Sequence, residues 1–176
     1  MSTPVVPVLV RVSGAAAHAP FPAPAHPGDA GLDLRAETSC SIAPGHRVTV
    51  GTGVALALPH GFAAYVLPRS GLAARHGITV LNAPGTIDAG YRGEIRVTLL
   101  NTDRTAAFDV NVGDRIAQLV LHPIHTIAFT QVEQLPGSAR NEQGFGSTGG
   151  FGGSALGPTG QTTAERPSSP TDQIKD

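Results

Sequence analysis

The chain has 176 residues, 40% of them hydrophobic, and a formal net charge of -1. This length suits one domain with a tail, and the balanced charge indicates neither a nucleic-acid partner nor a membrane surface. The only lysine is Lys175, so a Schiff-base lysine or a Walker-type phosphate loop is excluded from the body. The sequence shows no signal-peptide pattern and no apolar run that could span a bilayer, so we expect a cytoplasmic protein.

Short apolar runs with a period of two predict β-strands. They cover residues 5–12, 48–50, 53–58, 62–67, 93–100 and 115–124. In the run 93–100, Ile95, Val97 and Leu99 share one face, which is typical of a half-buried antiparallel strand. One short helix is expected over residues 70–76, with Gly77 as its C-terminal cap. The sequence therefore predicts an all-β sandwich or barrel with one short helix.

The composition changes towards the C-terminus. From Gly149 onward the sequence is Gly, Ser, Thr, Pro and charged residues with almost no apolar spacing, which predicts disorder. The single cysteine, Cys40, cannot form an intrachain disulfide, and we interpret it as a buried or half-buried small residue. His122 and His125 have no Cys, Asp or Glu cluster nearby in sequence, so no metal site is predicted there.

Residues 82–94 combine one carboxylate, Asp88, and one aromatic ring, Tyr91, with a stretch of turn-forming residues. Glycines and a proline beside an acid and a ring predict a β-hairpin whose backbone can approach a ligand closely. We interpret this segment as part of a pocket. An ordinary surface turn with an exposed aspartate is the alternative.

Two segments earlier in the chain place polar groups in apolar surroundings. Asp29 and Asp33 are four residues apart, which puts both on one face of an extended chain. A turn acid followed by a strand-edge acid is the alternative. Arg69 and Ser70 open the short helix, where free N–H groups of the first turn favour an anion site. Simple capping of the helix by Ser70 is the competing interpretation.

Two later segments also carry polar groups. Residues 113–118 form a turn into a strand, where a surface pair between Asp114 and Arg115 is the plain interpretation. Residues 140–149 are too rich in glycine to fold independently, yet they offer an arginine, a ring and two hydroxyls. This composition suits a mobile arm that closes over a phosphorylated ligand with a stackable ring.

Taken in order, these five segments resemble the five motifs of the trimeric deoxyuridine triphosphatases (dUTPases). These enzymes convert dUTP to dUMP and pyrophosphate, which keeps uracil out of DNA and supplies dUMP for dTMP synthesis. The resemblance runs from about Asp29 to Gly149. It implies a jelly-roll-like β-sandwich or distorted barrel with a flexible C-terminal arm. It also implies a homotrimer whose active sites are shared between subunits, and Mg²⁺ on the triphosphate.

The resemblance assigns three parts to the chain. Residues 1–138 would form the β-barrel core, residues 139–150 an arm that closes the active site, and residues 151–176 a disordered tail. Asp88 would activate the water that attacks the α-phosphorus. Asn82 and Ile87 would read uracil, and Tyr91 would exclude a ribose 2'-hydroxyl. Asp33 would orient metal-bound water and make no direct bond to the ion.

The remaining site residues would bind the phosphates and close the site. A second subunit would hold the phosphate chain through Arg69, Ser70, Gly71 and Gln118. The arm of a third subunit would contribute a ring that stacks on uracil and groups that bind the terminal phosphates. These arm residues are Arg140, Phe145, Gly146, Ser147 and Thr148.

The arm departs from the family pattern at Asn141 and Gln143, where glycine is usual. Two other functions are compatible with parts of the pattern. A dCTP deaminase would share the fold, but it needs a further catalytic glutamate that we cannot place, and it leaves Phe145 unexplained. A non-catalytic β-sandwich interaction module would not need the expected base, sugar-contacting ring and arm arginine together.

Overall fold

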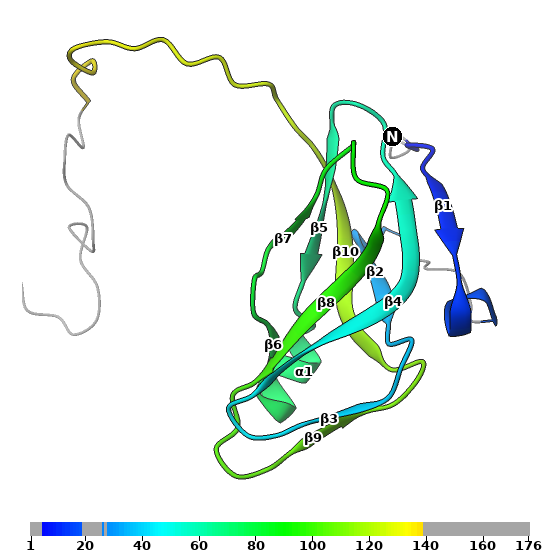
Figure 1. Ribbon diagram of the computed structural model, residues 1–176. Helices are drawn as coiled ribbons and strands as arrows, with labels where there is room; N and C mark the ends of the chain where they lie inside the picture. The colour runs from blue at the N-terminus through cyan, green and yellow to red at the C-terminus, as the bar shows by residue number, and fades with distance from the viewer. Residues whose placement is uncertain (1–4, 19–25, 27, 139–176) are drawn as a thin grey trace, which may run out of the picture. The chain divides into compact units, whose positions relative to one another are not determined.

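The computed structural model of the protein describes residues 5–18, 26 and 28–138. In these residues the strands form two four-stranded antiparallel sheets and one two-stranded ribbon (Figure 1). The first sheet contains, in spatial order, β1 (Leu9–Val12), β4 (Arg47–Ala57), β8 (Glu94–Asn101) and β6 (Ile78–Val80). The second contains β2 (Gly31–Arg35), β10 (Arg115–Pro123), β5 (Phe62–Leu67) and β7 (Gly85–Ile87). The ribbon pairs β3 (Cys40–Ile42) with β9 (Phe108–Val110).

Two short helices complete the described secondary structure. They are the 3₁₀ helix η1 (Gly14–His18) and the α-helix α1 (Ser70–His76). All described helices and strands lie within residues 1–128, one of the two compact units of the chain. Residues 129–138 of the second unit contain no helix or strand. No helix in the described residues has the length and hydrophobicity needed to cross a membrane.

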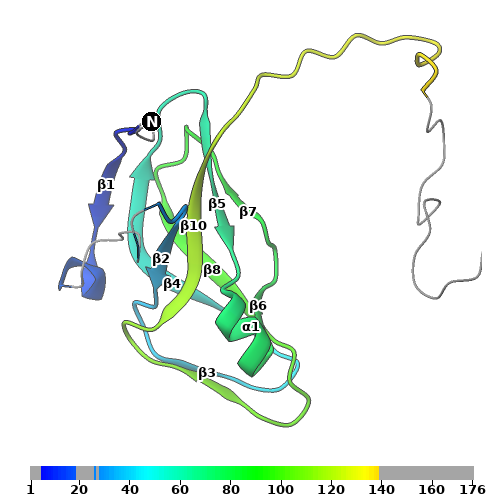
Figure 2. The same cartoon turned by 180° about the vertical axis from the view of Figure 1, so that it is seen from behind.

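The hydrophobic core lies between the two sheets, which Figures 1 and 2 show from opposite sides. Strand β8 illustrates its origin, because Ile95, Val97 and Leu99 are almost completely buried while Arg96 between them is exposed. Each of these aliphatic side chains contributes about 2 kcal/mol through removal from water. The all-β fold with one short α-helix and the alternating burial in this strand are therefore both confirmed, and the 3₁₀ helix η1 is an addition to the expected elements.

Helix α1 also agrees with the sequence prediction. It ends at Gly77, whose φ of 63° is left-handed and whose N–H donates to the carbonyl of Ala73. Glycine adopts this conformation without the steric penalty of a side chain. At the other end the cap is Arg69, and no side chain bonds to the first turn. The alternative in which Ser70 caps the helix is therefore wrong.

Strand boundaries differ from the prediction where the pairing is irregular. The runs 48–50 and 53–58 form one strand, β4, whose register with β8 shifts between Gly51 and Ala55. At this shift Gly53 has a φ of 66°, a value that favours glycine. The break in alternation therefore marks a bulge inside one strand. The first run is shorter than expected, because β1 begins only at Leu9.

The buried side-chain amide of Asn101 connects the C-terminal end of β8 to neighbouring segments. Asn101 is fully buried, and its Nδ2 donates to the carbonyls of Ile42 and Ala106, both at 2.9 Å. Its Oδ1 accepts the N–H of Asp103 at 2.9 Å. These bonds connect β8, β3 and the turn that precedes β9.

Replacing Asn101 with alanine should lower the free energy of unfolding by about 3 kcal/mol. The substitution leaves buried carbonyls without a donor and also creates a small cavity. Chemical denaturation of both proteins measures the difference. The control is Asn111→Ala at an exposed position, which should stay within about 0.5 kcal/mol of the unmodified chain. Equal losses in the two variants would contradict the assigned role of Asn101.

Candidate active site

A pocket of about 280 Å³ lies beside the segment 82–94. Its lining combines aliphatic and polar residues. The lining residues are Val66, Val80, Asn82, Gly85, Thr86, Ile87, Asp88, Tyr91, Glu94, Ile95 and Arg96. Four of the predicted site residues, Asn82, Ile87, Asp88 and Tyr91, therefore share one pocket. This agrees with the interpretation of the segment as part of a pocket rather than a plain surface turn.

The chain path through this segment differs from the expected hairpin. Strand β7 pairs with β5 in the second sheet, whereas β8 pairs with β4 and β6 in the first. Residues 88–93 therefore connect the two sheets, and the pocket lies where the chain passes between them. The hairpin prediction was wrong because a three-residue strand has too little sequence signal to reveal its partner.

Glycine brings the backbone close to the pocket at β7. Gly85 is buried and pairs with Val66, and a Cβ added to it would lie 3.4 Å from Nδ2 of Asn82. The Asn82 side chain thus lies against the backbone of Gly85. This arrangement leaves main-chain groups and one amide available to a planar polar ligand.

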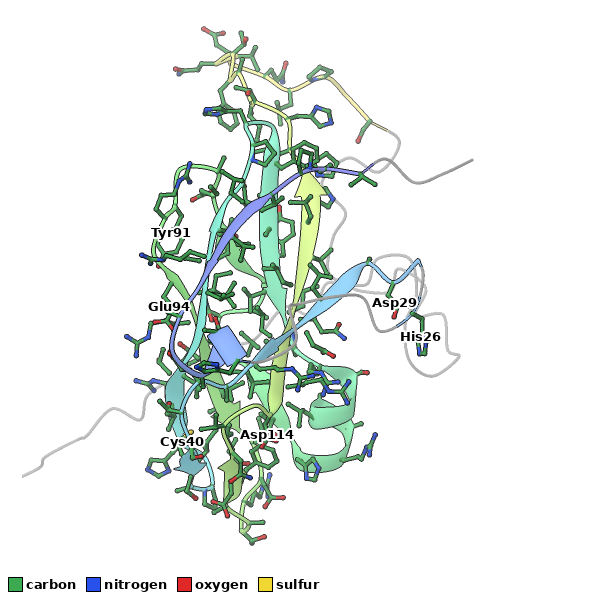
Figure 3. All side chains as sticks on the ribbon, turned by 90° about the vertical axis from the view of Figure 1, so that its right-hand side faces the viewer. His26, Asp29, Cys40, Tyr91, Glu94 and Asp114 are labelled. Atoms are coloured by element: carbon green, nitrogen blue, oxygen red, sulfur yellow. The ribbon has the colours of Figure 1, made fainter. Side chains whose placement is uncertain are left out.

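Asp88 and Tyr91 occupy the turn that follows β7. The N–H of Tyr91 donates to the carbonyl of Asp88 at 3.0 Å, and the Tyr91 hydroxyl donates to the carbonyl of Glu94 at 2.9 Å. Figure 3 shows Tyr91 and Glu94 along the same side of the body. The Asp88 side chain is exposed, and no group among residues 5–18, 26 and 28–138 bonds to its carboxylate. Its oxygens are free to accept a proton from water.

A second pocket of about 320 Å³ is polar. It is lined by Asp29, Ala30, Gly31, Asp33, Arg69, Arg115 and Gln118. Asp33 joins two guanidinium groups, because Oδ1 accepts from Nε of Arg69 at 2.8 Å and Oδ2 from Nη1 of Arg115 at 3.2 Å. Each arginine has five N–H donors, and Asp33 uses one of each. Nη1 of Arg69 also donates to the carbonyl of Arg115 at 3.4 Å, and the other donors can bind an anion such as phosphate.

Strand β10 brings these distant residues together. It pairs with β2 on one side and with β5 on the other, so that Gln118 is opposite both Asp33 and Leu67. Arg69 follows β5 by two residues and is half-buried beside Asp33. Two of the residues expected to hold the phosphate chain, Arg69 and Gln118, therefore line one pocket of this chain together with Asp33.

For two acidic residues, Asp114 and Asp29, the structure decides between the interpretations that the sequence allowed. The expected surface pair between Asp114 and Arg115 is absent, because Asp114 accepts the N–H of Asn111 and Arg115 pairs with Asp33. Asp29 lies before β2 and accepts the N–H of His26 at 2.9 Å (Figure 3). It is therefore a turn acid, although it lines the same pocket as Asp33.

The structure does not place all predicted site residues in one pocket. The first pocket is lined by Asn82, Ile87, Asp88 and Tyr91. The second pocket is lined by Asp33, Arg69 and Gln118. Ser70 is exposed and Gly71 is half-buried at the start of α1, and neither lines these two pockets. The arm residues, Arg140, Phe145, Gly146, Ser147 and Thr148, lie outside the described residues.

The sequence interpretation did not assign Arg115 or Glu94 to a site. Arg115 and Gln118 are three residues apart, so simple alternation would place them on opposite faces. A register shift between Arg115 and Ala117 alters this alternation, and both side chains line the same pocket. Glu94 is the last residue of the segment 82–94, but no role was assigned to its side chain, because no local sequence signal distinguishes it.

A model of the dUTPase family matches residues 17–149. The chain belongs to the dUTPase family. It is a dUTP diphosphatase, a hydrolase, and this membership bears out the resemblance of the five motifs. It also favours dUTP hydrolysis over the dCTP deaminase and interaction-module alternatives.

Curated dUTPases are close relatives of this chain. The deoxyuridine 5'-triphosphate nucleotidohydrolase of Leifsonia xyli is 60% identical over 129 residues, which cover 73% of this chain and 85% of that protein. The protein of the same name from Thermobifida fusca is 59% identical over 136 residues, covering 77% of this chain and 76% of its own. Most of each chain therefore takes part in the match.

Solved dUTPase structures share the fold. The dUTPase of Staphylococcus bacteriophage 80alpha with dUpNHpp has a TM-score of 0.74 and 27% identity, covering 81% of this chain and 98% of that chain. A point mutant of the dUTPase from phage phi11 of S. aureus, described with a structural Mg(II) ion, has a TM-score of 0.66 and 25% identity. It covers 73% of this chain and 97% of that chain.

Proposed function

We propose that this dUTPase produces dUMP and pyrophosphate through attack of water on the α-phosphorus, with Asp88 as general base. The observation that carries the proposal is the exposed, unpaired Asp88 carboxylate in one pocket with Asn82 and Tyr91. A general base must lie within hydrogen-bond reach of the attacking water, and here nothing in the described chain competes for its oxygens. In-line placement of this water contributes further to the rate acceleration.

In this proposal the first pocket binds the nucleoside. Asn82 and the backbone of β7 form hydrogen bonds with the polar edge of uracil. An amide and main-chain groups offer the same kinds of donor and acceptor as a pairing base. Ile87 limits the space around the base and excludes a 5-methyl group. The ring of Tyr91 lies against deoxyribose and excludes a 2'-hydroxyl. A site that excludes a group by contact discriminates through kcat/KM.

The second pocket binds the phosphate chain. The free guanidinium donors of Arg69 and Arg115, together with the Gln118 amide, face this pocket. We assign Ser70 and Gly71 to the same task at the start of α1, where they follow Arg69 directly. Because Asp33 holds both arginines, it fixes the direction of their remaining N–H groups.

The residues of the second pocket fit a magnesium ion that is carried by the substrate. In the described residues no cluster of three or more His, Cys, Asp or Glu side chains could hold an ion. Mg²⁺ commonly keeps several waters and binds through substrate phosphates. Asp33 would then contact such an ion through water, since each of its oxygens has capacity beyond one guanidinium bond. The ion would neutralise phosphate charge, while Arg69 and Arg115 orient the chain.

The two pockets complete one site if neighbouring subunits contribute to it. We propose a homotrimer in which the Asp88 pocket of one subunit meets the Asp33 pocket of a second. The arm, residues 139–150, would close the site with Arg140, Phe145, Gly146, Ser147 and Thr148, and residues 151–176 would follow as a tail. The phage 80alpha relative with dUpNHpp supports a triphosphate ligand for this family member as well. The physiological consequence would be exclusion of uracil from DNA and supply of dUMP for dTMP synthesis.

Incubation with Mg²⁺ and either dUTP, UTP or dCTP tests this function. The proposal predicts equal amounts of dUMP and pyrophosphate from dUTP, much slower turnover of UTP and no ammonia from dCTP. Release of ammonia from dCTP would identify a deaminase instead. Absence of pyrophosphate with every nucleotide would indicate a binding module that has lost catalysis.

A further inference from the structure

The turn that carries Tyr91 has a fixed backbone. The N–H of Tyr91 donates to the carbonyl of Asp88 at 3.0 Å. Nη1 of Arg92 donates to the carbonyls of Ala89 at 2.6 Å and Tyr91 at 2.8 Å. The position from which the Tyr91 side chain begins is therefore set relative to Asp88. Its direction depends on what the ring contacts.

The ring occupies the space where a side chain of residue 93 would begin. A Cβ added to Gly93 would lie 2.6 Å from Cζ and 3.0 Å from Cε2 of Tyr91, and nearer still to the hydroxyl oxygen. Carbon atoms in van der Waals contact are about 3.5–4.0 Å apart, so the two groups cannot coexist. Residue Tyr91 is 43% exposed, so its ring has space to move into solvent. A side chain at position 93 would therefore displace the ring towards solvent.

The other contact of the ring is anchored to the sheet. The Tyr91 hydroxyl donates to the carbonyl of Glu94, at the first residue of β8. The Glu94 side chain in turn accepts the N–H of Gly53 at 2.9 Å, at the bulge of β4. This bond holds the start of β8 against β4, so the carbonyl that receives the hydroxyl has a fixed position.

We propose that Gly93 is a specificity-determining residue for the sugar, because only glycine at this position lets the Tyr91 ring lie against the backbone. The inference rests on the proposed function, in which that ring excludes a ribose 2'-hydroxyl. Gly93 acts through Tyr91 and is a positioning residue. Gly93 thereby controls whether the site accepts a uridine triphosphate with a hydrogen atom or one with a hydroxyl group at the 2' carbon.

The same turn supplies a matched control. Gly90 is three residues earlier, is exposed, and a Cβ added to it would meet no atom within 4 Å. Neither Gly90 nor Gly93 has the positive φ that alanine would resist. Gly93→Ala and Gly90→Ala are thus the same chemical change in one turn, and the three atoms nearest to the added methyl group at position 93 all belong to Tyr91.

The kinetic test compares kcat/KM for dUTP and UTP. Gly93→Ala should reduce the dUTP-over-UTP ratio by about tenfold or more, mainly through faster UTP turnover. Gly90→Ala should stay within about twofold of the unmodified enzyme. Tyr91→Phe removes the hydroxyl bond and leaves Gly93 in place, and it should give an intermediate ratio. If Gly93→Ala fails to fold, the double variant Tyr91→Ala with Gly93→Ala provides the test, because it lacks the ring that the added methyl group would meet. The double variant should fold and show the ratio of Tyr91→Ala alone, and its failure to fold would overturn the proposal.

A spectroscopic test detects the ring directly. The chain contains two tyrosines, Tyr65 and Tyr91, so 3-fluorotyrosine labelling gives two ¹⁹F resonances, and Tyr65→Phe assigns them. The Tyr91 resonance should shift in Gly93→Ala and remain in place in Gly90→Ala, without any nucleotide present. An unshifted resonance in Gly93→Ala would overturn the proposed displacement.

Tyr91→Ala separates failure of this inference from failure of the proposed function. If Tyr91→Ala reduces the dUTP-over-UTP ratio and Gly93→Ala does not, the role of Gly93 is wrong and the sugar contact stands. If Tyr91→Ala leaves the ratio unchanged, the proposed sugar contact itself is wrong, and the inference fails with it. If both variants reduce the ratio and Gly90→Ala does not, the proposal is supported.

Discussion

Replacing Asp88 with asparagine should lower kcat for dUTP by at least ~10²-fold, the usual scale for loss of a general base. Asparagine has nearly the same shape and cannot accept the proton of the attacking water. The Asp88 carboxylate makes no bond to the described residues, so the exchange removes no structural contact. The turn itself is held by main-chain atoms of Asp88, which asparagine retains.

Steady-state kinetics and nucleotide binding measure this effect separately. We expect the affinity for a non-hydrolysable dUTP analogue to change little, because the base acts on water. Asp109→Asn is the control, since Asp109 is exposed on β9, in the ribbon with β3. It should leave kcat unchanged. Turnover of Asp88→Asn close to that of the control would show that another group activates the water.

Mixed trimers should regain activity that neither parent variant has. One parent carries Asp88→Ala, and the other ends before Arg140 and lacks the arm. If base and arm of each site come from different subunits of a cyclic trimer, every mixed trimer contains one intact site. Equal mixing makes about three-quarters of trimers mixed, and one site in three is intact in each. Activity should therefore recover to roughly a quarter of the unmodified enzyme.

Co-refolding followed by a dUTP assay measures this recovery. The same two proteins mixed without refolding are the control, because their subunits have not exchanged. If the arm closed over its own subunit, no site could contain both parts, and the refolded mixture would remain as inactive as its parents. The experiment thus tests whether the site is shared between subunits, once each parent alone has been shown to be inactive.

The parts of the fold that were predictable depend on local physics. The alternation of Ile95, Val97 and Leu99 and the left-handed cap at Gly77 each follow from a few neighbouring residues. The partner of β7 was not predictable, because its three residues pair with β5, which precedes it by many positions. A short strand finds its partner through the rest of the sheet, and its own sequence does not specify that choice.

The candidate site also has a part that the local sequence predicts and a part that depends on long-range pairing. Asp88 and Tyr91 share one turn, and the sequence identified them together. The ion pair of Asp33 and Arg115 spans 82 positions and depends on the register of β10 with β2. The register shift beside Arg115 reverses the face that alternation predicts for it. The contact of Gly93 with Tyr91 is local, but it depends on the direction of one ring, which spacing alone does not give.

Hydrolysis of dUTP in H₂¹⁸O tests most directly the central claim that water attacks the α-phosphorus. The oxygen of the attacking water remains on the phosphorus that it attacks. The account predicts one ¹⁸O atom in dUMP and none in pyrophosphate, measured by mass spectrometry after a single turnover. Label in pyrophosphate with unlabelled dUMP would place the attack on the β-phosphorus and contradict the account.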